Sequence, residues 1–252
     1  ELTFLCRKRL VPIMTAFFCT FLAIVLLFLW PPVFNAIVTF GKWIVGMGPF
    51  GALIYGFFNR LLIPTGLHHA LNNVFWFDTA GINDIGKFQS GKDAVKGITG
   101  RYQAGFFPVM MFGIPAAALA MYHTAKSSQK KQVYAWFLAS SISAFFVGVT
   151  EPIEFAFMFV APVLFIIHAA LTGLSLFIAA IFHWTAGFSF SAGLIDFVLS
   201  LVNPVSNKPW MLLVQGIIFF ILYYTIFRFV IQVFNLSTIG RGYNELSDPT
   251  AN

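Results

Sequence analysis

The sequence is short of charged residues and of cysteines, and both shortages narrow the class of protein. Charged side chains make up 10% of its 252 residues, whereas hydrophobic ones make up 59% and the mean hydropathy is +0.83. Soluble domains are about 25% charged. A water-soluble globule of this size could not bury so much apolar surface. The composition therefore predicts an all-α membrane protein, a multi-span bundle of helices.

Motifs for catalysis, metals and targeting are also absent from the sequence. It has no phosphate-binding glycine loop, no HExxH, no GxSxG and no signal-peptide cleavage pattern. The two cysteines, Cys6 and Cys19, lack metal or redox spacing. We expect no metal, no cofactor and no catalytic residue, and we expect Cys19 to be a small core residue. Because residue 1 is Glu rather than Met, we expect the chain to begin within a longer protein.

The charges that are present are mostly basic, with a formal net charge of +6. They gather at residues 7–9, at Lys126 with Lys130 and Lys131, and at Arg241. In a membrane protein such clusters set orientation and do not indicate nucleic-acid binding. We therefore place residues 7–9 and 126–131 on the cytoplasmic side.

Apolar runs long enough to cross a bilayer, about 20 residues each, recur along the chain. The first, residues 11–30, is expected to end at Pro31 and Pro32, since proline interrupts the helical hydrogen-bond ladder. Residues 35–58 form either one span or a span broken near Gly48. The remaining expected elements are 106–122 with a break at 113–115, 133–149, 155–184 as two elements, and 210–234.

Two polar stretches interrupt these runs. Residues 59–73 contain Pro64 and Gly66, which break a helix, so this stretch is expected to be a re-entrant or discontinuous segment inside the protein. Residues 78–103 are the most polar long stretch and are expected to form a solvent-exposed loop or lid.

Glu151 is the strongest site candidate, because an ionisable group at membrane depth costs about 2.5–3.5 kcal/mol and usually faces a pathway. It stands between Thr150 and Pro152, a pattern typical of a helix start that Thr150 or Glu151 could cap. Glu151 could accept hydrogen bonds from ligand hydroxyls, or it could be a buried cap paired with Arg60. Glu154, three residues on, shares its helix face and is expected to be a supporting or pairing group.

His68 and His69 can donate and accept hydrogen bonds, which suits a hydroxyl-rich ligand. Successive helical side chains diverge by about 100°, so we expect one of the two to face a given site. Both could instead be structural. Arg60 could pair with a buried carboxylate, offer its donors to the ligand, or extend to the membrane interface. Weaker candidates are His123, His168, His183 and Asp196.

Several motifs carry a resemblance to a known family. They are RLLIPTGLHH (60–69), GFFPVMMFGIP (105–115), AMYHTAK (120–126), GVTEPIEFAFMFVAPVL (148–164), GFSFSAG (187–193) and FNLST (234–238). Together they span nearly the whole chain. The chain resembles the membrane (IIC) component of sugar phosphotransferase systems, in the glucose superfamily and nearest the N-acetylglucosamine branch. Residues 80–86 depart from that branch, so a glucose or maltose member stays open.

The resemblance implies a role for each matching residue. His68 and Glu151 match the family's sugar-contacting residues, Arg60 and Thr150 match further binding positions, and His69 with Asn72 follow as second-rank positions. Residues 1–238 then form the substrate-binding half of a IIC domain with re-entrant hairpins, and residues 239–252 a polar linker. The family's N-terminal half is missing here, so a fragment, a split gene or an incomplete sequence is expected.

The resemblance also implies partners and a location in the bacterial cytoplasmic membrane. A IIB domain phosphorylated on cysteine would phosphorylate the sugar, fed by IIA and the histidine phosphocarrier protein, and the full-length protein would form a homodimer among lipids. The IIB cysteine motif is absent from this sequence, so no phosphoryl-accepting residue is expected in it. Two alternatives stay open. One is a cation-coupled transporter with Glu151 and the histidines as proton carriers, and the other is a non-transporting sensor or remnant.

Overall fold

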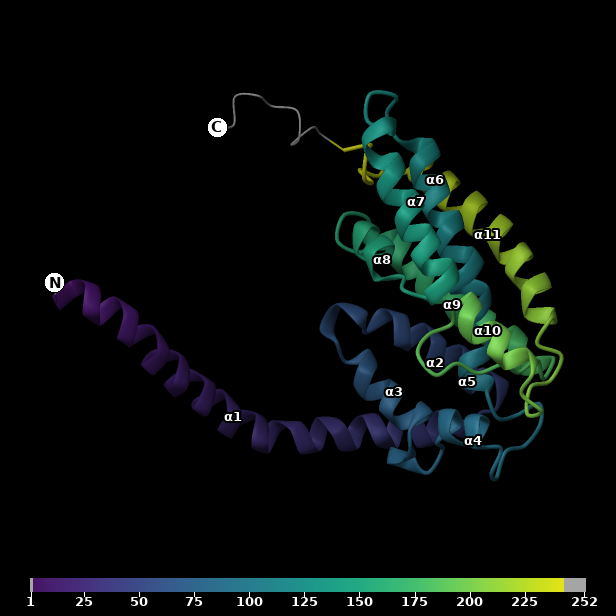
Figure 1. The fold of residues 1–252 in the computed structure, drawn as a ribbon, viewed down its shortest axis with the longest axis horizontal. Coiled ribbons are helices and arrows are strands. Elements are labelled where there is room, and N and C mark those ends of the chain that lie inside the picture. Colours follow the sequence, from purple (N-terminus) through teal and green to yellow (C-terminus); the bar gives the residue numbers. More distant parts are fainter. Residues whose placement is uncertain (1, 243–252) are drawn as a thin grey trace. The chain divides into compact units, whose positions relative to one another are not determined.

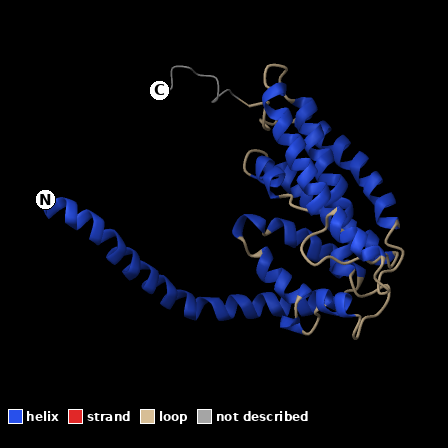
Figure 2. Ribbon diagram, viewed as in Figure 1, coloured by secondary structure: helices blue, strands red, loops and turns tan. Residues whose placement is uncertain are grey.

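The computed structural model describes residues 2–242, apart from the side chains of residues 2–9 and 80, and its described regular elements are helices joined by loops (Figure 1, Figure 2). An isolated antiparallel bridge pairs Thr185 with Asn207. The predicted all-α class is therefore confirmed. The elements are α1 (Leu2–Val45), α2 (Pro49–Leu61), η1 (Ile63–Thr65), α3 (His68–Trp76), η2 (Asp78–Ala80), α4 (Asp84–Ser90), α5 (Arg101–Ala104), η3 (Pro108–Gly113), α6 (Ile114–Thr124), α7 (Lys130–Val147), α8 (Glu151–Met158), α9 (Pro162–Ile181), α10 (Leu194–Leu201) and α11 (Met211–Val233).

The chain divides into two compact units, residues 1–40 and residues 41–252. The smaller unit is the greater part of α1, and the larger unit holds all the other elements. Four helical stretches among the described residues are long and apolar enough to cross a membrane: Leu10–Val45, Arg101–Thr124, Pro162–Ile181 and Met211–Val233. α7, predicted as a further span, is not one of the four; it begins with two lysines.

The expectation that Pro31 and Pro32 end the first span is wrong. α1 continues through both prolines to Val45. A proline removes one backbone donor from the ladder, but membrane helices tolerate the loss through local adjustments of the backbone. The chain breaks instead at Gly48, whose φ of 61° lies in the left-handed region, and α2 starts at Pro49. Of the two alternatives for residues 35–58, the broken one is therefore correct.

The predicted discontinuity in residues 59–73 is confirmed. α2 ends at Leu61, a short 3₁₀ turn carries Pro64, and Gly66 adopts a left-handed φ of 73° before α3 begins. Two other predictions about helix breaks had different outcomes. Residues 155–184 do form two elements, α8 and α9, whereas the predicted break at 113–115 is replaced by a π-helical turn that joins α5 to α6.

The polar stretch 78–103 is not a simple exposed loop. It contains α4, and the side chains of Asp84 and Phe88 on that helix are buried. Asp84 accepts hydrogen bonds from the Gly100 N–H at 2.8 Å and from the Gln103 amide at 2.9 Å. The ladder of α4 ends at Gly91, in the left-handed region. The stretch is thus anchored to the bundle by a buried carboxylate.

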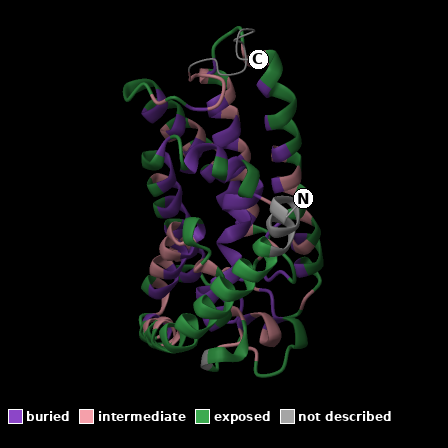
Figure 3. Ribbon diagram, turned by 90° about the vertical axis from the view of Figure 1, so that its left-hand side faces the viewer, coloured by how far each residue is buried: buried purple, intermediate pink, exposed green. Residues whose placement is uncertain are grey.

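The core of the larger unit lies where α6, α7, α8, α9 and α11 face one another, and the buried residues run along their inner sides (Figure 3). α2 packs along α9, and α11 packs along α6. A Cβ on Gly56 of α2 would lie 3.1 Å from the Cα of Gly173 on α9. Small residues of this kind let two membrane helices approach closely, so this pair sets how near α2 lies to α9.

Candidate functional site

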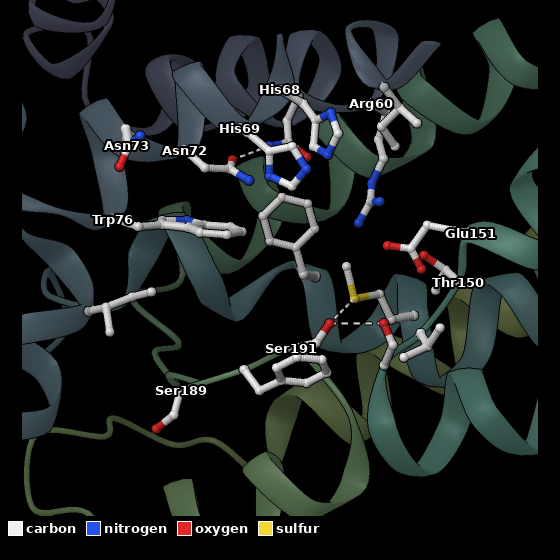
Figure 4. Close-up of a pocket in the computed structure, with 18 of the residues that line it drawn as sticks. Arg60, His68, His69, Asn72, Asn73, Trp76, Thr150, Glu151, Ser189 and Ser191 are labelled. Atoms are coloured by element: carbon white, nitrogen blue, oxygen red, sulfur yellow. Dashed lines mark hydrogen bonds between the residues drawn. The ribbon is translucent and has the colours of Figure 1, made fainter. Parts of the chain in front are cut away.

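A cavity of about 420 Å³ lies in the larger unit, and all six residues predicted to bind a ligand line it (Figure 4). They come from two parts of the chain that are some 80 residues apart in sequence. One group lies on α2 and α3, and the other lies at the start of α8. The six are Arg60, His68, His69, Asn72, Thr150 and Glu151.

The first wall of the cavity is built by α3. His68, Asn72 and Trp76 are four residues apart, so they share one face of the helix and all line the cavity. The prediction that just one of the two adjacent histidines would face the site is wrong. His69 lines the cavity as well, with its ring centroid 4.0 Å from that of His68. The two histidines are the first two residues of the helix.

Asn72 is held from behind by two buried polar residues. Its Oδ1 accepts hydrogen bonds from the Tyr55 hydroxyl at 2.9 Å and from the amide of Asn59. With its oxygen engaged on α2, Asn72 has its amide nitrogen left for a ligand. The side chain therefore offers a donor in a fixed position.

The second wall is the start of α8. α7 ends at Gly148, whose φ of 80° turns the chain, and α8 begins at Glu151 as its sequence predicts. Thr150, the N-cap residue, makes no side-chain capping hydrogen bond at this helix start. The side chain of Glu151 is exposed, and its carboxylate faces the cavity opposite the guanidinium of Arg60 and the ring of His68 (Figure 4).

Arg60 forms its ion pair with Glu154, with 3.0 Å between Nη1 and Oε1, and both side chains are buried. The alternative that Glu151 is a buried partner of Arg60 is therefore wrong, whereas the expectation that Glu154 is a pairing group is confirmed. The same Oε1 lies 3.2 Å from Nε2 of His168, which the sequence placed among weak candidates. Arg60 also lies over the ring of Phe106, 4.9 Å from its centroid.

The third side of the cavity is the loop of residues 187–193, which was not predicted from the sequence to be part of the site. Ser189, Phe190 and Ser191 line the cavity. Asp196 holds this loop by accepting from the backbone N–H groups of Ser189 at 3.0 Å and Ser191 at 3.4 Å. The run of glycine and serine in the GFSFSAG motif was the signal that could have identified it.

A chain of hydrogen bonds joins this loop to the polar stretch 78–103. Gln103 donates to Asp84 through its amide nitrogen, and its Oε1 accepts from the Phe188 N–H at 3.0 Å. Burial raises the pKa of the Asp84 carboxyl above its ordinary value, against the lowering effect of these donors. The stretch therefore supports the cavity through Gln103.

The lining has two chemical characters. Trp76, Phe77, Phe106 and Phe190 are aromatic, and the residues around Arg60 are polar or charged. The Trp76 indole donates to the Tyr102 carbonyl at 3.2 Å, which fixes the plane of its ring. Flat apolar surface beside a few convergent hydrogen-bonding groups is typical of a site for a small polar ligand.

The described part of the chain contains no group of three or more His, Cys, Asp or Glu side chains able to hold a metal ion. Cys19 is exposed, so the expectation that it is a core residue is wrong; it belongs to a helix whose side chains at residues 10–32 are exposed. Cys6 and the basic side chains of residues 7–9 lie outside the described side chains, and residues 243–252 of the predicted linker lie outside the described residues. The rest of that linker contacts the bundle, since the Gly240 carbonyl accepts from the Lys126 N–H at 2.9 Å.

Comparison with known proteins gives relatives over almost the full chain. An N-acetylglucosamine-specific EIICBA component from Klebsiella pneumoniae is 50% identical over 95% of this chain and 38% of the relative. An N-acetylglucosamine-specific EIICB component from Bacillus subtilis is 47% identical over 98% of this chain and 54% of the relative. A glucose-specific EIICBA component from Staphylococcus carnosus is 40% identical over 97% of this chain and 38% of the relative. The chain thus spans between 38% and 54% of the length of these relatives.

A family model described as "Phosphotransferase system, EIIC" matches residues 1–173. This match covers more than half of the chain, and the four membrane-capable helices agree with it. The chain is a multi-pass membrane protein that belongs to the EIIC family of the phosphotransferase system.

Proposed function

We propose that this chain is the sugar-binding part of a phosphoenolpyruvate-dependent sugar permease in the bacterial cytoplasmic membrane. One observation carries the proposal. A cavity at the broken helices gathers a carboxylate, a guanidinium, two imidazoles and three asparagine amides beside aromatic rings. Such a set can hydrogen-bond several hydroxyls of a pyranose while the rings cover its apolar face.

Each lining residue has a role in this proposal. Glu151 accepts hydrogen bonds from sugar hydroxyls through its exposed carboxylate, and His68 donates or accepts across the cavity from it. Arg60 donates through the guanidinium nitrogens that Glu154 does not engage. Thr150, His69 and Asn72 complete the ring of polar contacts.

The sugar in this proposal is N-acetylglucosamine. Relatives named for that sugar are 43–50% identical to this chain, and the glucose-specific ones are 40% identical. The cavity supports the choice, because it sets the Asn72 amide close to the ring of Trp76, one turn along the same helix face. An acetamido group offers a carbonyl to the first and a methyl to the second. Competition of glucose and maltose against labelled N-acetylglucosamine tests this choice.

The phosphoryl group is proposed to come from a separate IIB domain, phosphorylated on cysteine and supplied through IIA and the histidine phosphocarrier. Relatives named EIICBA and EIICB combine these components in one protein. In this chain Cys19 lies on the apolar stretch of α1. A thiol there has no helix N-terminus or glycine-rich loop to cradle a phosphate. Covalent label on this chain from phosphoenolpyruvate, or sugar phosphate formed without IIB, would contradict the division of labour.

The test of the transport mechanism uses the intact transporter that contains this chain, in sealed vesicles. Uptake should require phosphoenolpyruvate and the phosphocarrier proteins, and it should survive a protonophore. Uptake that follows the proton gradient and ignores phosphoenolpyruvate would show a cation-coupled transporter instead.

Orientation is proposed from the basic residues, which place the loop between α6 and α7 in the cytoplasm. Ser127 in that loop is exposed. A cysteine at position 127 should therefore resist an impermeant thiol reagent added to intact cells and react after the cells are opened. Rapid labelling of intact cells would reverse the orientation.

A further inference from the structure

A buried series of hydrogen-bonded polar side chains leads from Arg60, which lines the cavity, through residues of three further helices. Arg60 on α2 donates from Nη1 to Oε1 of Glu154 on α8. Nε2 of His168 on α9 lies 3.2 Å from the same oxygen, and Nδ1 of His168 lies 2.9 Å from the hydroxyl of Tyr223 on α11. Glu154, His168 and Tyr223 are each 0% exposed, and none of them lines the cavity.

The donors and acceptors of this series are consistent with one protonation state. If His168 is neutral, its Nε2–H donates to Glu154 and its Nδ1 accepts from the Tyr223 hydroxyl. Glu154 then accepts from both His168 and Arg60, and the buried charges of Arg60 and Glu154 cancel. A protonated His168 would leave an uncompensated positive charge among apolar helices, which is costly.

These hydrogen bonds fix the side chain of Arg60, which is long and flexible and makes few other contacts. Within the described residues, the side chain of Arg60 makes one hydrogen bond, to Glu154. Phe106 covers one face of its guanidinium. His168 contacts the same carboxylate oxygen of Glu154, and the Tyr223 hydroxyl contacts His168 in turn, so both residues help to fix the carboxylate that holds Arg60.

We propose that Glu154, His168 and Tyr223 are positioning residues for the sugar site, which set sugar affinity through the placement of Arg60 without touching the sugar. This inference rests on the proposed function. It assigns a role in the binding site to a residue of α11, a helix that contributes nothing to the cavity lining.

The first test compares two neighbouring tyrosines of α11 in the intact transporter. Tyr223→Phe removes the hydroxyl that hydrogen-bonds to His168. Tyr224→Phe removes a hydroxyl that hydrogen-bonds to His123 and Arg228, neither of which is in contact with Glu154 or His168 through these bonds. We expect Tyr223→Phe to weaken binding of labelled N-acetylglucosamine about fivefold, the effect of one neutral hydrogen bond. Tyr224→Phe should bind as the unmodified protein does. Unchanged affinity in Tyr223→Phe, or an equal loss in Tyr224→Phe, overturns the inference.

The second test asks whether the donor of His168 matters rather than its bulk. His168→Gln keeps an amide that can donate to Glu154, and His168→Leu fills similar space without a donor. We expect the Gln variant to stay within about threefold of the unmodified affinity and the Leu variant to lose about tenfold. Equal losses in the two variants would show that packing alone is at work. Should either variant fail to fold, the tyrosine pair still decides.

A third variant separates this effect from general loosening of the bundle. Gln215 on α11 donates hydrogen bonds to the carbonyl and the hydroxyl of Ser175 on α9. Gln215→Leu therefore removes buried hydrogen bonds between α9 and α11 that do not involve Arg60, Glu154, His168 or Tyr223. Sugar affinity should survive this change, and a loss as large as that of Tyr223→Phe would refute a specific route through Arg60. Unmodified transporter that binds none of N-acetylglucosamine, glucose or maltose would overturn the proposed function itself, before any variant is compared.

Discussion

Glu151 and Glu154 stand three residues apart on α8, yet their surroundings differ completely. Glu151 is exposed and faces the cavity, whereas Glu154 is 0% exposed and is shared by Arg60 and His168. Spacing of three residues predicts that the two share a face. They do not share an environment, because Glu151 is the first residue of the helix and lines the cavity, whereas Glu154 lies a turn further along and is buried.

The difference teaches how a membrane bundle can keep a charge available for a ligand. A carboxylate inside the bundle needs compensation, and Glu154 receives it from Arg60. The other carboxylate, Glu151, stays accessible because it lines the cavity, while Arg60 is already paired with Glu154. The buried carboxylate therefore supports the exposed one.

The largest expected effect is on the free energy of unfolding, which should fall strongly when Glu154 is removed and hardly at all when Glu151 is removed. Glu154→Ala leaves Arg60 buried without its ion-pair partner, which should cost about 3–5 kcal/mol of unfolding free energy. Glu151→Ala should change it by no more than about 0.5 kcal/mol, as for a surface substitution. Thermal unfolding of the intact transporter in detergent measures both. Equal destabilisation would mean that the two environments do not differ as the structure shows.

Sugar binding should give the opposite contrast, through Glu151. Glu151→Gln keeps the shape and removes the charge, and a hydrogen bond to a charged acceptor contributes about 1.5–3 kcal/mol. Binding of labelled sugar should fall at least tenfold, since about 1.4 kcal/mol corresponds to tenfold, while expression and the unfolding temperature stay as before. Normal binding by this variant would remove Glu151 from the site.

A smaller effect is expected at Asp84, the other buried carboxylate described above. Asp84→Asn has one acceptor oxygen where the structure uses two, so one of the bonds from Gly100 and Gln103 is lost at a cost of about 1–3 kcal/mol. The unmodified protein should also lose stability as pH rises above the ordinary Asp pKa, because burial raises the pKa of Asp84 in the native state and the unfolded chain releases that proton first. Melting temperatures measured from pH 4 upward should show this fall in the unmodified protein and not in the Asn variant.

Much of this site could be predicted from the sequence, because local signals mark it. Gly66 with Pro64 marked the broken segment before α3, and the Thr150–Pro152 pattern marked the start of α8. An ionisable residue next to a helix break is a strong signal in an apolar sequence. These signals explain why the six residues could be predicted, and all six line one cavity in the structure.

What could not be predicted depends on contacts between distant segments. His168 carries no local signal, since a single histidine in an apolar helix looks the same whether or not Glu154 and Tyr223 lie beside it. Asp84 looked solvent-exposed because its neighbours in sequence are polar, and its burial follows from packing against Gly100 and Gln103. The prediction that Pro31 and Pro32 end the first helix failed for a different reason: prolines are better tolerated in a membrane helix than in a helix in water.

The smallest effect we expect comes from the hydrogen bond that sets the position of Glu151. The Ser191 hydroxyl donates to the Gly148 carbonyl at 2.9 Å, at the turn that leads into α8. Glu151 thus has its own support, made of one neutral bond where Glu154 has an ion pair and a histidine. Ser191→Ala should therefore weaken sugar binding about fivefold, the value for one neutral hydrogen bond. Ser189→Ala is the matched control, because Ser189 lines the same cavity and is held through its backbone N–H to Asp196. Equal affinities for the two variants would show that Ser191 does not position the start of α8. A larger loss in Ser189→Ala would place the sugar against the outer part of the loop instead.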